Sequence, residues 1–137
     1  MNNQIAYKKG YKYQLIGRYV HLLHGVFPDT SAEFARIEHD KLIIYIKYAW
    51  DGASGPALDT LNFMRGSLIH DTLYQLMRAG ALPTSYRKEA DKELVRICRE
   101  DGMSRLRAWW VYKAVHTFAA RLATPEKVRK IYYAPIN

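Results

Sequence analysis

Cysteine is nearly absent from the sequence: Cys98 is the one cysteine among 137 residues. It cannot form an internal disulfide, so the chain is not a disulfide-stapled scaffold, and it fits a reducing compartment or a virion protein without disulfides. A chain of this length buries about two thirds of its unfolded surface and folds without disulfides or a metal. Because Cys98 lies on an apolar helical stripe, we expect an inert core thiol.

Long apolar runs are missing as well. No run approaches the ~20 residues of a membrane-spanning helix. The polar start, Met1 to Gln4, is not followed by the apolar region of a secretory signal. We therefore predict a soluble protein that meets a membrane, if at all, only peripherally.

Acidic residues are the scarcer charge. The chain has 13 Asp and Glu residues against 21 Lys and Arg residues, which gives a net charge of +8. Such a bias favours anionic partners, namely nucleic acid, a lipid surface or an acidic protein, although it also serves solubility alone. No nucleic-acid motif with a defined docking mode is present, so binding of nucleic acid would rest on the basic surface alone.

The spacing of apolar residues changes near residue 50, from a period near two to a helical period. In the first part, β-branched and aromatic residues predict strands over residues 11–15, 19–23, 33–37 and 42–48. In the second part, helices are predicted over residues 61–78, 84–102 and 104–122. Turn formers separate elements at Gly17, at residues 39–41 and at residues 51–56. The predicted fold class is α+β, with a small N-terminal antiparallel β-sheet followed by a three-helix bundle.

The length fits a single domain over residues 1–137. We divide it into a β-rich part, residues 1–50, and a loop and helical part, residues 51–123. A basic C-terminal segment, residues 124–137, follows as a short helix or an arm.

Two neighbouring predicted helices carry the residues that indicate chemistry. His70 and Tyr74, at i and i+4, share a face of the first helix, and Asp71 borders that face. Asp91 interrupts the apolar stripe of the second helix, where an ionised carboxylate costs several kcal/mol unless it is paired. A short loop makes the two helices antiparallel, so that Asp91 can face His70. Such a pair orients the imidazole and raises its basicity, as a general base requires.

A structural interpretation of the same residues stays open. Asp91 can instead pair with Arg87, four residues earlier, or with Arg65 across the bundle. His70 is then an ordinary half-buried histidine in a polar network that locks the preceding loop onto the helices.

The loop before the first helix is a candidate cation site. It is rich in turn formers, among them Gly52, Ser54 and Gly55. Such a loop can direct several carbonyl oxygens toward one point, and a hard cation such as Ca²⁺ takes these together with a carboxylate. Asp71 or Asp59 would supply the carboxylate. The alternative is a tight turn that Asp51 caps.

The chain resembles a small phage and prophage family catalogued as domain of unknown function 1353. The matching blocks are residues 48–56, 68–74 and 87–94, with an aromatic third helix around residues 110–115. They occur in order and cover most of residues 42–120. The resemblance implies a phage origin and a location in the host cytoplasm or the virion, and it supplies no established activity.

The order of a Gly-rich loop, a His-Asp-x-x-Tyr helix and an Ala-Asp helix is distantly similar to the core of secreted phospholipase A2. The resemblance implies that His70 activates water, that Asp91 orients His70, and that Tyr74 hydrogen-bonds Asp91. The cysteines that usually flank these positions in that family are replaced here by Ile69, Leu73 and Ala90.

The same resemblance implies a calcium site. Asp71 would hold Ca²⁺ together with the loop that contains Gly52, Ser54 and Gly55. The ion would stabilise the oxyanion formed during attack on the ester. The loop of this chain matches the glycine-rich loop of that family poorly.

Two further groups of residues are interpreted as structural. The third predicted helix interleaves aromatic and basic residues, which can stack on bases or anchor at a lipid interface but more often belong to a core. Of Trp109 and Trp110, we expect at most one to be exposed. His21, His24 and His39 lack metal-ligand spacing, and we expect them at the surface or at a sheet edge.

Three functions remain in view. The first is a phage-derived hydrolase that uses a His70–Asp91 dyad to cleave an ester, such as a phospholipid ester at an anionic lipid surface. The second is a non-enzymatic phage protein that binds a virion or host protein. The third is nucleic-acid binding through the basic surface.

Overall fold

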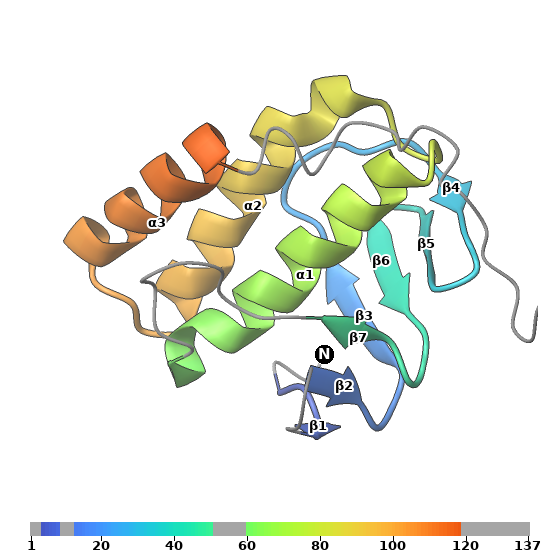
Figure 1. Ribbon diagram of the computed structural model, residues 1–137, viewed down its shortest axis with the longest axis horizontal. Helices are drawn as coiled ribbons and strands as arrows, with labels where there is room; N and C mark the ends of the chain where they lie inside the picture. Colours follow the sequence, from blue (N-terminus) through green and yellow to red (C-terminus); the bar gives the residue numbers. More distant parts are fainter. Residues whose placement is uncertain (1–3, 9–12, 51–59, 119–137) are drawn as a thin grey trace, which may run out of the picture.

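The computed structural model describes residues 4–8, 13–50 and 60–118 of the chain (Figure 1). Within these residues, short strands occupy the first part and helices the second. The predicted α+β fold class is confirmed, with antiparallel sheets at the N-terminal end followed by three helices. None of the described helices combines the length and the apolar character needed to cross a membrane.

The described strands form two antiparallel sheets, where the sequence predicted one. The three-stranded sheet has the order β1 (Tyr7–Lys8), β2 (Tyr13–Leu15), β7 (Ala49–Trp50). The four-stranded sheet has the order β3 (Tyr19–Leu22), β6 (Lys41–Ile44), β5 (Ala35–Glu38), β4 (Thr30–Ser31). The predicted hairpin turn joins β5 to β6, and its residues His39 and Asp40 have positive φ values of 49° and 63°, as in a type I′ turn.

The predicted strand over residues 42–48 is wrong in its second half. β6 ends at Ile44, and Lys47 takes a left-handed φ of 74°. After Ile44 the chain leaves the four-stranded sheet, and the N–H of Lys47 donates to the carbonyl of Leu15, the last residue of β2, at 3.0 Å. The chain continues as β7 of the other sheet, so one apolar run serves both sheets.

The three helices follow the apolar spacing closely. α1 (Leu61–Arg78) has the predicted bounds. α2 (Arg87–Glu100) begins later than predicted, because a 3₁₀ turn, η1 (Thr84–Tyr86), precedes it. α3 (Arg105–Phe118) begins after Ser104, whose side-chain oxygen accepts the N–H of Arg107 at 3.2 Å. The predicted end of the third helix at residue 122 and the segment 124–137 lie outside the described residues.

α2 packs against both α1 and α3 (Figure 1). Side chains of α1 share one apolar core with both sheets. The largest fully buried members of this core include Trp50, Leu42, Leu68 and Leu73. α1 and α2 approach closely at Gly66, where a Cβ would lie 2.9 Å from both Cys98 Sγ and Leu94 Cδ1. Cys98 is fully buried, as predicted, and burial raises the pKa of its thiol to about 12.

Replacing Gly66 with valine should lower the free energy of unfolding by about 1–3 kcal/mol, because the added side chain overpacks the contact between α1 and α2. Urea denaturation measures the change. Gly17→Val is the matched control, since a Cβ at Gly17 meets no atom within 4 Å. Equal losses of stability in the two variants would contradict the close approach of the helices at Gly66.

Candidate active site

α1 and α2 bring His70 and Asp91 into contact. The His70 Nε2 atom lies 2.7 Å from Asp91 Oδ1. Asp91 is fully buried, and the side chain of His70 is 11% exposed. The antiparallel helices therefore place the odd carboxylate of α2 against the histidine of α1, as the apolar spacing predicted.

Two more side chains converge on the Asp91 carboxylate. The Tyr74 hydroxyl donates to Oδ1 at 2.5 Å. His70 and Tyr74 are one turn apart on α1, and the centroids of their rings lie 4.2 Å from each other. From α3, Nδ1 of His116 lies 3.3 Å from Oδ2. The contact with Tyr74 has the geometry that the phospholipase resemblance implies. The sequence did not predict that His116 would join them, because nothing in the spacing within α3 indicates which helix it faces.

The charge of Asp91 fixes the tautomer of His70. Burial alone would raise the pKa of Asp91, but the hydrogen bonds from His70, Tyr74 and His116 outweigh burial and hold the pKa below its ordinary value. An ionised carboxylate only accepts hydrogen bonds, so Nε2 of His70 carries the proton and Nδ1 carries the lone pair. Among the described residues, no group hydrogen-bonds Nδ1. A lone pair held in this way is what a general base needs.

The two alternative partners of Asp91 bind elsewhere. Arg65 of α1 donates to Glu100 at 2.8 Å and to Asp101 at 2.9 Å. Arg87 donates to the backbone carbonyl of His116 at 3.2 Å. Within the part of the chain that the structure describes, Asp91 forms an ion pair with neither arginine. Its partners are therefore the two histidines and the tyrosine.

The calcium prediction falls largely outside the described residues. Gly52, Ser54 and Gly55, together with Asp51 and Asp59, lie in segment 51–59. Asp71 is half-buried, and its Oδ2 accepts a short hydrogen bond from the Tyr48 hydroxyl. Ca²⁺ takes six to eight oxygen ligands, and among the described residues Asp71 belongs to no group of three or more His, Cys, Asp or Glu side chains placed to hold a metal ion. The calcium site stays a prediction.

A second buried carboxylate, Glu93, lies two residues beyond Asp91 on α2. Its Oε2 is 3.0 Å from His21 Nε2 and 2.6 Å from His24 Nδ1. Burial alone would raise the pKa of Glu93, but hydrogen bonds from both histidines and from the His24 backbone lower it to about 2. His21 lies on β3, an edge strand of the four-stranded sheet, within the prediction of a surface or sheet-edge position, but its imidazole is buried against Glu93 and not exposed. His24 and His39 are exposed, as predicted.

The signal for Glu93 was present in the sequence. Glu93 stands three residues after Ala90 and four before Ile97, on the apolar side of α2. A carboxylate at that spacing needs a buried partner. The partner comes from β3 and the chain after it, however, and helical spacing does not identify a residue so distant in sequence.

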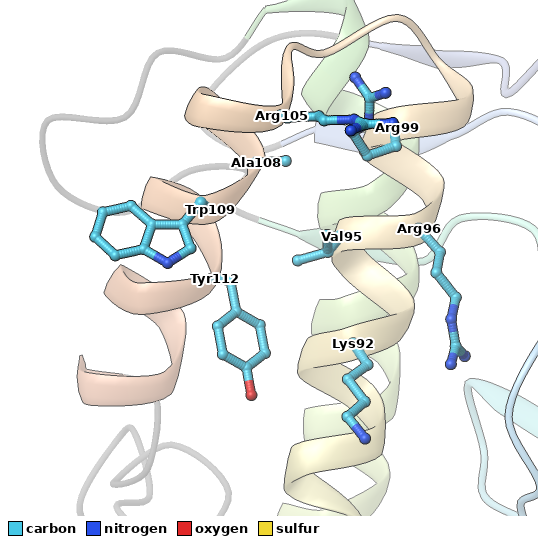
Figure 2. A pocket seen from close by; sticks show the side chains of 8 residues that line it. All are labelled: Lys92, Val95, Arg96, Arg99, Arg105, Ala108, Trp109 and Tyr112. Carbon is cyan, nitrogen blue, oxygen red and sulfur yellow. The ribbon is translucent and has the colours of Figure 1, made fainter.

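A groove of about 440 Å³ lies between α2 and α3. Figure 2 shows the residues that line it: Lys92, Val95, Arg96 and Arg99 from α2, and Arg105, Ala108, Trp109 and Tyr112 from α3. All four charged residues among them are basic. Trp109 and Trp110 are 51% and 62% exposed, so the prediction of at most one exposed tryptophan is wrong. Both stay exposed because α3 packs through a narrow side that buries Ala108 and Val111.

Comparisons of the chain with protein-family models, with curated proteins and with solved structures give no match. Function is therefore inferred from the residues of the site and their geometry.

Replacing Asp91 with alanine should lower the free energy of unfolding by about 2–4 kcal/mol, because the buried donors of His70 and Tyr74 lose their acceptor. Denaturant titration followed by circular dichroism measures the loss. Glu33→Ala removes one negative charge from an exposed residue and controls for net charge. If both variants changed stability by less than about 0.5 kcal/mol, the buried network would not hold the helices together.

Proposed function

We propose that the chain is an ester hydrolase in which His70 is the general base, Asp91 orients it and Tyr74 supports Asp91. One observation carries the proposal. Nε2 of His70 lies 2.7 Å from Asp91 Oδ1, and Nδ1 has no hydrogen-bond partner among the described residues. An ionised Asp91 only accepts hydrogen bonds, so the proton belongs on Nε2. Nδ1 is not among the buried described atoms that lack a partner, and the His70 side chain is 11% exposed, so a water molecule can serve as the partner of this nitrogen.

The reaction follows from this arrangement. Water that donates to Nδ1 of His70 attacks the ester carbonyl as its proton moves to Nδ1, and a tetrahedral oxyanion forms. The imidazolium that results is stabilised by the negative charge of Asp91, 2.7 Å from Nε2. When the oxyanion collapses, the C–O bond to the alcohol breaks and the leaving oxygen takes the proton from Nδ1. A carboxylic acid and an alcohol are released, and His70 returns to its neutral form.

The substrate class rests on charge and on resemblance. The distant similarity to secreted phospholipase A2 suggests a glycerophospholipid ester, and the similarity to a phage and prophage family suggests a bacterial membrane as its source. The net charge of +8 favours an anionic lipid. If Asp71 and the loop at 51–59 hold Ca²⁺, the ion supplies positive charge for the oxyanion.

The direct test is release of fatty acid from vesicles that contain phosphatidylglycerol, measured for the wild type and His70→Ala with Ca²⁺ or with chelator. We expect activity in the wild type and a loss of at least about 100-fold in His70→Ala, the contribution of a positioned base. A dependence on Ca²⁺ would support the predicted ion site, and chelator-resistant activity would remove it.

His39→Ala is the matched control, since His39 is an exposed histidine of the β5–β6 hairpin. It should keep wild-type activity. Thermal unfolding of each variant separates catalysis from stability. If no variant released fatty acid and His70→Ala only unfolded more easily, the network would be structural and the hydrolase proposal would fail.

The groove between α2 and α3 supports an anionic lipid as the docking partner. Its rim combines Arg99 and Arg105 with Trp109, and these side chains come from facing helices (Figure 2). Within the described residues, Arg105 forms no ion pair. Basic groups attract lipid phosphates, and exposed tryptophan is the side chain that favours the interface between water and lipid.

Reversing the charge of both Arg99 and Arg105 to Glu should weaken binding to anionic vesicles by about 10- to 100-fold, since each basic residue near such a surface contributes about 1 kcal/mol. Co-sedimentation with vesicles measures the affinity. The control reverses two exposed charges outside the groove, Arg18→Glu between β2 and β3 and Lys41→Glu in β6. An equal effect of the two double variants would mean that net charge, not the groove, attracts the lipid. If the Arg99→Glu, Arg105→Glu variant lost DNA binding while its vesicle binding stayed unchanged, the groove would be assigned to nucleic acid.

A non-enzymatic binding protein is the second candidate function. The observation that favours it is that Asp91 joins residues of all three helices through three side chains. In this alternative, the network has a structural role alone: it fixes α1, α2 and α3 in place beneath a binding surface. The hydrolysis assay separates this function from the first.

A further inference from the structure

Three potential metal-binding atoms meet around one point beside β3. Oε2 of Glu93 lies 3.0 Å from Nε2 of His21 and 2.6 Å from Nδ1 of His24. The three atoms lie within 4.8 Å of one another, and in the described residues no other group of His, Cys, Asp or Glu side chains gathers in this way. None of the three residues takes part in the His70–Asp91 dyad.

The Glu93 carboxylate is held so that one oxygen faces the imidazoles. Its other oxygen, Oε1, accepts the backbone N–H of His24 at 2.9 Å and that of Gly25 at 3.3 Å. These two bonds come from the backbone after β3 and fix the orientation of a side chain that reaches over from α2. The donors from one segment and the carboxylate from another are therefore brought together by the fold.

An outer layer of charged groups supports the exposed histidine. Nε2 of His24 lies 2.7 Å from Oε1 of Glu100, and the other Glu100 oxygen accepts Nη2 of Arg65 at 2.8 Å. Metal-binding histidines typically donate their second ring N–H to a carboxylate, which fixes the tautomer and the ring orientation. Glu100 stands in that position, and Arg65 holds it there.

We propose that His21, His24 and Glu93 form a binding site for a divalent transition metal ion, Zn²⁺ by preference. Two imidazole nitrogens and one carboxylate oxygen are a ligand set that Zn²⁺ uses when it keeps a fourth position open. Ligands about 2.0–2.1 Å from a tetrahedral ion stand roughly 3.3 Å apart. The contacts of 2.6 Å and 3.0 Å need only a small outward shift to reach that spacing.

The exposure of the site to solvent determines which group can serve as the fourth ligand of the metal ion. His21 and Glu93 are buried, whereas the side chain of His24 is 38% exposed. A bound ion would therefore face solvent beside His24 and take water or an anionic group as its fourth ligand. On binding, Zn²⁺ takes the place of two protons that face Glu93, one on Nδ1 of His24 and one on Nε2 of His21. The His24 proton goes to solvent, and the His21 proton goes to solvent or moves to Nδ1 of the same ring. Nε2–H of His24 continues to donate to Glu100.

The test is equilibrium dialysis of the untagged full-length chain against Zn²⁺, followed by measurement of bound metal. We expect one ion per chain, and Co²⁺ should give the visible absorption of a four-coordinate ion at the same site. His24→Ala should lose the ion without unfolding, because His24 lies at the surface. Glu100→Gln should keep the ligands and weaken binding by about 10- to 100-fold.

Two histidine variants serve as controls. His39→Ala removes an exposed histidine outside the cluster, and His70→Ala removes the proposed base; both should bind Zn²⁺ like the wild type. The proposal is overturned if the wild type retains no metal, if His24→Ala retains as much as the wild type, or if His70→Ala abolishes binding. The first two results would make the cluster a carboxylate–imidazole network only, and the third would place the ion at the dyad.

Discussion

A carboxylate with no exposure to solvent lies in the middle of the helical layer, and the arrangement of α1, α2 and α3 depends on keeping it paired. Moving an ion of this size out of water costs several kcal/mol, and Asp91 offsets that cost through donors from α1 and α3. If any of the three helices moved, a donor would be lost. Because the partners have to remain in place for the fold to persist, the orientation of His70 is fixed by the same bonds.

α2 is the element that links the two polar networks. Asp91 faces His70 and His116, whereas Glu93 faces β3 and the chain that follows it. Both carboxylates have pKa values below the ordinary range, since hydrogen bonds outweigh the effect of burial. Asp91 accepts them from two imidazoles and a tyrosine hydroxyl, and Glu93 from two imidazoles and the backbone. α2 is therefore held on two sides, by α1 and α3 through Asp91 and by the sheet through Glu93. These contacts limit how far α2 can shift relative to the other helices or to the sheet.

Local pattern predicted the elements, and the limits of that prediction have physical causes. The bounds of α1 and the hairpin at His39 and Asp40 follow from apolar spacing and turn chemistry alone. The strand predicted through residue 48 breaks because Lys47 adopts a left-handed φ, which its residue type does not indicate. The contact between His70 and Asp91 was predictable because a short loop joins their helices. His116 lies only 25 residues from Asp91, but the spacing within α3 does not indicate which helix it faces. His21 reaches α2 over 72 residues, and a contact at such a separation is set by tertiary packing.

The two networks differ in what a ligand must displace. At His70, one ring nitrogen is held by Asp91, and within the described chain the other has no hydrogen-bond partner, so water or substrate can approach its lone pair directly. At His24, both ring nitrogens contact carboxylates, so an incoming ligand has to replace a proton and must itself carry positive charge. A neutral or anionic molecule lacks the charge for that exchange, whereas a metal ion has it. The same kinds of side chain, placed on two sides of one helix, therefore support the proton transfer proposed at one site and the cation binding proposed at the other.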